Sequence, residues 1–307
     1  MVCFSLTFPA TKVAETAFSP VVAGVGRSVI GAAAAVLILA ARRQPLLPPR
    51  DILPRMLVVA AAVGIGFGLL SALALHQVDS VHGAVLTGLI PAATAGMAVL
   101  RAGERPRPAY WAALVLGLAV VTGFAVVQGG GRLRAGDLLL LAAMAVAGLG
   151  YAEGAAVARE HGGWRVICWA MILALPATGP VTAWAVVTGP APGRMSAAAV
   201  AGLGYTGLVS ACLGFFAWYR GLALGGVARV GKLQLAQPAL TLGWSALLLG
   251  EHVGWLSAAA AAAVIAATAV GRNARVDPSP VPAVSEKPAA GPAAPPGEGT
   301  RHGLLTR

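Results

Sequence analysis

Long apolar stretches alternate with short polar gaps over the first 271 residues of the chain. A helix needs ~20 mostly apolar residues to cross a bilayer, and the stretches lack the polar alternation of β-barrel strands. The pattern therefore predicts an all-α membrane protein with ten transmembrane helices. The predicted spans cover residues 1–17, 20–41, 55–75, 80–100, 109–128, 137–158, 164–187, 197–219, 230–250 and 253–271.

The composition supports a lipid bilayer as the main partner of the chain. Hydrophobic residues make up 58% and charged residues 11%, whereas a soluble domain has ~25% charged residues. The net charge of +11 does not indicate nucleic-acid binding, because the basic residues lie in the gaps and not on one wettable face. Residues 272–307 hold seven of the 21 prolines, so we expect a disordered tail there.

The basic residues of the gaps predict the orientation in the membrane. Thirteen arginines fall in the gaps on one side and three in the gaps on the other. Since cytoplasmic loops carry the excess of Lys and Arg, both termini are expected in the cytoplasm, with the protein in the inner or plasma membrane.

A motif near the end of the fourth span recurs near the end of the ninth. It consists of a proline and a later Gly-Glu pair, and the two copies lie 147 residues apart. Five spans per unit is an odd number, so the second copy is expected to be inverted relative to the first. The predicted repeats are residues 1–135 and 136–271, and the first helix looks truncated or short by this offset. The motif residues are Pro91, Gly103 and Glu104, then Pro238, Gly250 and Glu251.

Inverted repeats are the architecture of many secondary transporters. The repeated motif, the Ser19-Pro20 pair followed by Arg27, and the five-plus-five arrangement resemble EamA-type proteins of the drug/metabolite transporter (DMT) superfamily. The resemblance covers residues 1–271 and implies a central cavity among the first, third, fourth, sixth, eighth and ninth spans. Ala174 stands where the second repeat would carry a counterpart of Arg27, so any role of this arginine is confined to the first half.

Three ionisable residues inside the spans are candidates for the solute pathway. Lys12, Glu153 and Lys232 face a cavity or a partner more readily than lipid, because a charge at bilayer depth is costly. For the two lysines, snorkelling to the interface is the alternative. For Glu153, a proton-coupling role competes with a salt bridge to either lysine.

Two glutamines complete the predicted pathway. Gln234 and Gln237 precede Pro238 on one face of the ninth span, and hydrogen bonding between helices is their alternative role. Glu104 and Glu251, at the ends of their spans, are expected to cap or orient loops.

The expected function is secondary transport of a small organic solute (a metabolite, an amino acid or a drug) by alternating access, as efflux or exchange. A membrane-embedded transferase is the first alternative, but the sequence contains no cluster of catalytic residues. A non-transporting scaffold is the second. We predict no enzymatic activity, no cofactor and no metal site; a monomer and a dimer both stay open.

Overall fold

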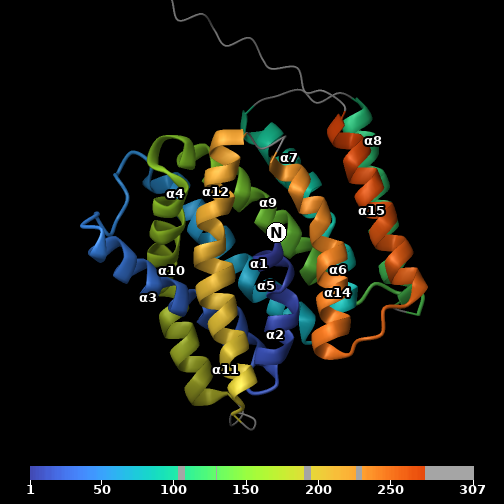
Figure 1. The fold of residues 1–307 in the computed structure, drawn as a ribbon, viewed down its shortest axis with the longest axis horizontal. Coiled ribbons are helices and arrows are strands. Elements are labelled where there is room, and N and C mark those ends of the chain that lie inside the picture. The colour runs from blue at the N-terminus through green and yellow to red at the C-terminus, as the bar shows by residue number, and fades with distance from the viewer. Residues whose placement is uncertain (103–107, 129, 190–194, 226–229, 274–307) are drawn as a thin grey trace, which may run out of the picture. The chain divides into compact units, whose positions relative to one another are not determined.

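The computed structural model describes residues 1–102, 108–128, 130–189, 195–225 and 230–273 (Figure 1). Helices, and no strands, form the regular structure of these residues, which confirms the all-α prediction. Five described helices are long and apolar enough to cross a membrane, and three shorter apolar helices accompany them. The five cover Val22–Ala41, Leu53–Leu75, Ala135–His161, Gly163–Thr188 and Ala197–Leu224; the shorter ones cover Val115–Gln128, Leu233–Leu249 and Trp255–Ala267.

Each apolar stretch of the first half forms one helix or a few consecutive helical segments. The first four stretches are divided where the helix changes its winding or breaks, whereas the fifth is continuous. The segments are α1 (Val2–Ser5) and α2 (Thr7–Glu15); η1 (Val22–Gly26) and α3 (Arg27–Ala41); α4 (Leu53–Val59), η2 (Ala60–Gly66) and α5 (Phe67–Leu75); α6 (Ser80–Thr87) and α7 (Ile90–Ala102); and α8 (Pro108–Gln128).

The second half has longer uninterrupted helices at its start. Two helices of 27 and 26 residues come first, and divided stretches follow. The segments are α9 (Ala135–His161); α10 (Gly163–Thr188); α11 (Ala197–Gly204), η3 (Tyr205–Leu213) and α12 (Gly214–Gly225); η4 (Gly231–Ala236) and α14 (Gln237–Leu249); and α15 (Trp255–Asn273).

The irregular turns recur at related positions. Both η2 and η3 are π-helical, and the last seven residues of η3 lie 147 positions after those of η2. Ile90 and Gln237, the first residues of α7 and α14, have the same separation. Pro91 and Pro238 follow them in the first helical turn, where the missing N–H of proline breaks no helical hydrogen bond.

Helices from the two halves pack against one another throughout the part of the chain that the structure describes. Helix α3 packs on α10, α6 on α14, and α8 on α15, and the last of these pairs lies side by side at one edge in Figure 1. Across the halves, α4 packs on α9 and α11 on α2, while α3 also contacts η3 and α10 also contacts η2.

Glycines allow several of these backbones to approach closely. A Cβ atom on Gly68 would overlap the carbonyl oxygen of Gly24, and one on Gly148 would lie 2.6 Å from the carbonyl carbon of Ala93. Small residues at helix crossings are typical of packing within membranes, where close contact stabilises the association of helices.

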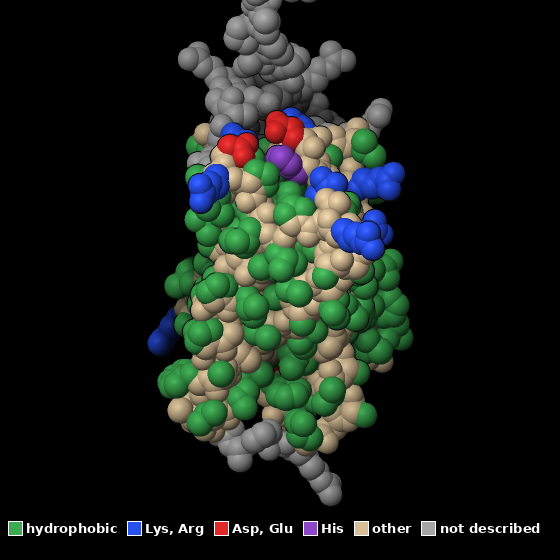
Figure 2. Space-filling view, turned by 90° about the vertical axis from the view of Figure 1, so that its left-hand side faces the viewer, with side chains coloured by type: hydrophobic (Ala, Val, Ile, Leu, Met, Phe, Trp, Pro, Cys, Tyr) green, Lys and Arg blue, Asp and Glu red, His purple; other side chains and the backbone are tan. Residues whose placement is uncertain are grey.

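Basic side chains gather at one end of the face shown in Figure 2, and an apolar surface continues from there toward the opposite end. The guanidinium groups of Arg42 and Arg165 lie over the Trp164 ring, with their Cζ atoms 5.1 and 5.5 Å from its centroid. Trp169 Nε1 donates a hydrogen bond of 2.9 Å to the Pro45 carbonyl. The loop after α3 and the start of α10 therefore lie at the same end of the protein.

Candidate functional site

A small cavity lies between helices of both halves of the chain. Its volume of about 10 Å³ is close to the minimum that one water molecule requires, so no organic solute fits in this conformation. Segments of the first, second, third, sixth, eighth and ninth predicted spans contribute to its walls. The lining residues are Phe4, Thr7, Arg27, Val63, Phe67, Ala147, Tyr151, Ser210, Phe215 and Gln237.

Arg27 is the one charged residue among those that line the cavity. It is the first residue of α3, its residue surface is 2% exposed, and its Nε atom has no hydrogen-bond partner within the described chain. Its Cζ atom lies 5.4 Å from the centroid of the Phe67 ring, which is compatible with a cation–π interaction. The structure thus places a buried positive charge at the cavity with an aromatic ring beside it.

Arg27 belongs to the sequence motif on which the resemblance to EamA-type proteins rests. It was not among the residues predicted for the solute pathway. Its position eight residues into the predicted second span is the signal that could have found it, because ionisable groups at such depth face cavities or partners.

Aromatic side chains form one wall of the cavity. The Phe4 and Phe215 ring centroids are 5.1 Å apart, and those of Tyr151 and Phe215 are 5.6 Å apart, both edge to face. Trp218 packs on the same group, with its ring 5.8 Å from that of Tyr151. Helices α1, α9 and α12 are therefore joined through ring contacts beside the cavity.

Hydroxyl and amide groups supply the remaining polarity of the lining. The Thr7 and Ser210 hydroxyls share a hydrogen bond of 2.7 Å, which connects α2 with η3. The Tyr151 hydroxyl and the Gln237 amide make no hydrogen bond within the described residues, although both residues are buried. These two groups are available to a bound molecule.

Three of the other predicted pathway residues are not among the described residues that line the cavity. Glu153 is 4% exposed, and its Oε2 atom lies 4.0 Å from Nε of Arg55, a contact that the sequence did not predict. Gln234 is buried, and both polar atoms of its amide lack a partner among the described residues. Lys12 is half-buried on α2, whereas the backbone of Lys232 lies in η4 and its side chain is outside the described residues.

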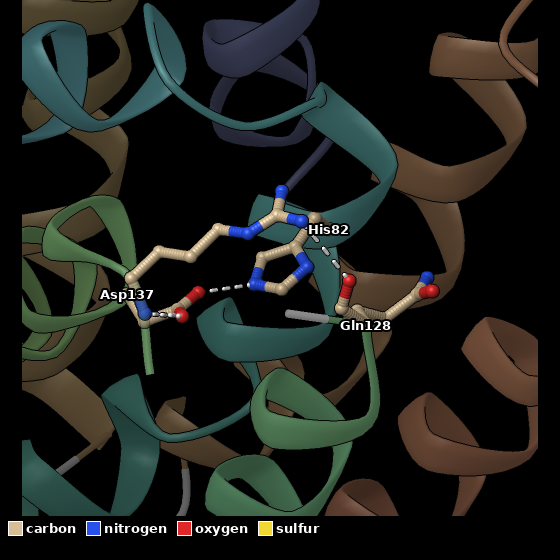
Figure 3. Close-up of polar contacts among 4 residues, drawn as sticks. His82, Gln128 and Asp137 are labelled. Carbon is tan, nitrogen blue, oxygen red and sulfur yellow. Dashed lines mark hydrogen bonds and ion pairs between the residues drawn. The ribbon is translucent and has the colours of Figure 1, made fainter. Parts of the chain in front are cut away.

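Two carboxylates hold the first turn of α6. Glu251 accepts hydrogen bonds from the backbone N–H groups of Ser80, at 3.1 Å, and Val81, at 2.7 Å. His82 Nε2 lies 2.6 Å from Oδ1 of Asp137, and both side chains are buried (Figure 3). We call these contacts, made by Ser80, Val81, His82, Asp137 and Glu251, the α6 anchor.

Further contacts extend the anchor on both sides. Asp137 also accepts a hydrogen bond of 2.8 Å from the Arg134 backbone N–H, within a capping box at the start of α9. The Arg134 guanidinium donates a 3.4 Å hydrogen bond to the backbone carbonyl of Gln128 (Figure 3). The Ser245 hydroxyl donates to that of Ser80 at 2.9 Å, which joins α14 to α6.

Of the two copies of the Gly-Glu pair, the structure describes the second, Gly250 and Glu251. Gly250 ends α14 with φ of 65°, a left-handed conformation that glycine adopts without strain, and Glu251 follows it. The N-cap residue of α6 itself, Asp79, makes no side-chain cap hydrogen bond. The Glu251 carboxylate instead accepts the N–H groups at the start of this helix. Gly103 and Glu104, the first copy, lie outside the described residues.

Comparisons with known proteins agree with the resemblance. The model of the EamA-like transporter family matches residues 1–126 and 134–270. The chain is 44% identical over 277 residues to "Uncharacterized transporter YdeK" of Bacillus subtilis (strain 168), which covers 88% of this chain and 93% of that protein. A crystal structure shares the fold at a TM-score of 0.59 and 18% identity, over 88% of this chain and 97% of that one. The chain therefore belongs to the EamA-like transporter family.

Proposed function

We propose that the protein is a secondary transporter that moves a small organic solute across the cell membrane by alternating access, as efflux or exchange. Family membership supports membrane transport as the general function. The observation that carries the mechanism is the cavity, because residues of both halves line it at related positions. Val63 and Ser210 are 147 positions apart, and so are Phe4 and Tyr151.

The packing supports ten spans arranged as two inverted repeats, residues 1–135 and 136–271. When 147 is added to the residue numbers, α3 falls on the second half of α10, η2 on η3, and α8 on α15. The contact of α3 with η3 therefore has a counterpart in the other half, the contact of α10 with η2, and the structure contains both contacts. Such equivalence favours two similar conformations that open the cavity to opposite sides.

The positions of the loops support the proposed orientation. The gap at 42–52, which carries three arginines, and the start of α10, which carries Arg165, are held at one end through Trp164. The α6 anchor joins the gaps before α6, α9 and α15, which belong to the side whose gaps carry three arginines in all. We therefore assign the anchor to the outer side and both termini to the cytoplasm. The tail at 272–307, for which we propose no activity, lies outside the described residues apart from its first two positions.

A transferase is less well supported than a transporter. Among the described residues of the lining, Arg27 is the one charged side chain, and none is a carboxylate, histidine or cysteine that could act as acid, base or nucleophile.

Solute movement in proteoliposomes tests the proposal. The purified full chain is reconstituted, and counterflow of labelled amino acids, carboxylates and amines is measured with and without an imposed pH gradient. We expect at least one class of solute to exchange, and Ser210→Trp, which fills the cavity, to abolish the exchange. The matched control is Val187→Trp, at a position 83% exposed on the apolar surface. Exchange that survives Ser210→Trp, or no exchange of any solute, would contradict the proposal.

A further inference from the structure

The buried guanidinium of Arg27 has no negative partner among the residues that the structure describes. The ion pairs within the described residues use Arg55, His76 and His82 as their basic members. No carboxylate is among the described residues that line the cavity, and the Phe67 ring lies beside the guanidinium. A buried charge without a counter-ion is strongly unfavourable, so an anion that enters the cavity gains a partner already in place.

Other groups at the cavity also favour a negatively charged solute. The Tyr151 hydroxyl and the Gln237 amide have donors that no described residue uses. The described lining of the cavity therefore combines one full positive charge and two neutral donors.

The walls indicate what the rest of the solute resembles. Phe4, Phe67, Tyr151 and Phe215 line the cavity with four aromatic rings, and the Thr7 and Ser210 hydroxyls bond to each other. Flat apolar groups pack well between rings, and polar groups attached to them would lose water without replacement.

We propose that the transported solute is an organic monoanion with an apolar, preferably aromatic, body, and that Arg27 binds its carboxylate. This inference rests on the proposed transport function and names its substrate class. The planar guanidinium presents paired N–H donors that match the two carboxylate oxygens. A single arginine suits a single negative charge, whereas a phosphate dianion would require a further cation, and the described residues of the lining include none besides Arg27.

The test compares solutes that share an apolar body and differ in the polar group and its charge. Binding of phenylacetate, phenylacetamide and phenethylamine to the purified full chain is measured by equilibrium dialysis. A second set, hexanoate, hexanamide and hexylamine, replaces the ring by an aliphatic body. We expect the carboxylate to bind most tightly in each set, and phenylacetate to bind more tightly than hexanoate.

Substitutions at Arg27 assign the effect to one residue. Because a hydrogen bond to a charged group contributes strongly, Arg27→Gln should weaken phenylacetate binding about tenfold or more. Arg27→Lys keeps the charge without the paired donors and should give an intermediate affinity. Arg50→Gln, at an exposed arginine in the gap before α4, is the charge-matched control and should bind like the original protein. The melting temperature of Arg27→Gln should be unchanged or higher, which shows that the loss is not one of folding.

The outcomes separate this inference from the proposed function. Transport of amines or neutral solutes without carboxylates would keep the transporter and overturn the substrate class. Carboxylate binding that persists in Arg27→Gln, or no binding by any carboxylate, would also overturn the inference. Carboxylate binding through Arg27 without movement across proteoliposomes would instead keep the site and contradict the transport function.

Discussion

The imidazole of His82 and the carboxylate of Asp137 lie 2.6 Å apart in a buried position and join α6 to α9. The His82 ring also packs on Phe124 of α8, at 5.0 Å between centroids. Together with Glu251, this pair holds the start of α6 against elements from both halves of the chain. The α6 anchor therefore holds both halves of the chain together at the end that we propose faces outward.

Loss of the histidine should open this end. In His82→Gln the short contact with Asp137 is lost or weakened, and a buried carboxylate loses a partner, which costs ~1–3 kcal/mol. We expect a lower melting temperature and faster reaction of a cysteine at Phe124 with a membrane-impermeant maleimide. His252→Gln, an exposed histidine next to Glu251, is the control and should change neither value. Equal behaviour of the two variants would show that the pair does not hold the outer side closed.

Glu251→Ala should destabilise the same helix by a different route. Both carboxylate oxygens accept backbone N–H groups at the start of α6, and the loss of a helix cap costs ~0.5–2 kcal/mol. Thermal unfolding followed by tryptophan fluorescence should give a lower midpoint. Glu160→Ala, at an exposed glutamate near the end of α9, serves for comparison. A midpoint for Glu251→Ala at or above that of Glu160→Ala would argue against the cap.

Gly68→Ala should be poorly tolerated because the added methyl group meets backbone. It would overlap the Gly24 carbonyl oxygen and press on Nε of Arg27 at 3.0 Å. Overpacking of this kind costs ~1–3 kcal/mol or more, so we expect a lower melting temperature and weaker solute binding. Gly243→Ala, at a helical glycine with open space around its Cβ position, should be neutral or stabilising by up to ~1 kcal/mol. Equal stability of the two variants would contradict a close contact between η1 and α5 at Gly24 and Gly68.

Labelling of single cysteines tests the orientation. A cysteine at Met195, 63% exposed in the gap before α11, should react with an impermeant reagent in intact cells. One at Arg50, exposed in the gap before α4, should react only after the membrane is permeabilised. Native Cys168 and Cys212 are buried, and half-buried Cys3 is replaced by serine in the background. The reverse labelling pattern would place the termini outside.

Substitution of Glu153 tests a role in proton coupling. Glu153→Gln keeps the size of the side chain and cannot release a proton, so we expect solute exchange to persist and its response to a pH gradient to vanish. Arg55→Gln is the comparison, because its side chain is 61% exposed and such pairs contribute ~0–1 kcal/mol. Transport by Glu153→Gln that still follows the gradient would exclude the coupling role, and loss of the folded protein would favour a structural one.

The positions of the helices could be predicted from local properties of the sequence. Apolar length anticipates where helices form, and Pro91 and Pro238 each lie in a first helical turn after an irregular segment. The partners of buried charges were not predictable in this way. The Arg55–Glu153 contact and the 3.9 Å contact between His76 and Glu15 depend on how each helix is rotated about its axis. Packing decides that rotation, through crossings such as Gly24 on Gly68, and a single sequence gives no direct measure of it.

Arg27 has an electrical consequence because Ala174 stands at the related position of the second half. Two conformations that exchange the roles of the halves place this lone charge at different depths in the membrane. A transmembrane voltage does ~2.3 kcal/mol of work per elementary charge per 100 mV for complete crossing, and a fraction of that for partial crossing. In the proposed cycle a bound monoanion neutralises the charge. The voltage therefore acts on the return of the empty protein and leaves the loaded step unaffected.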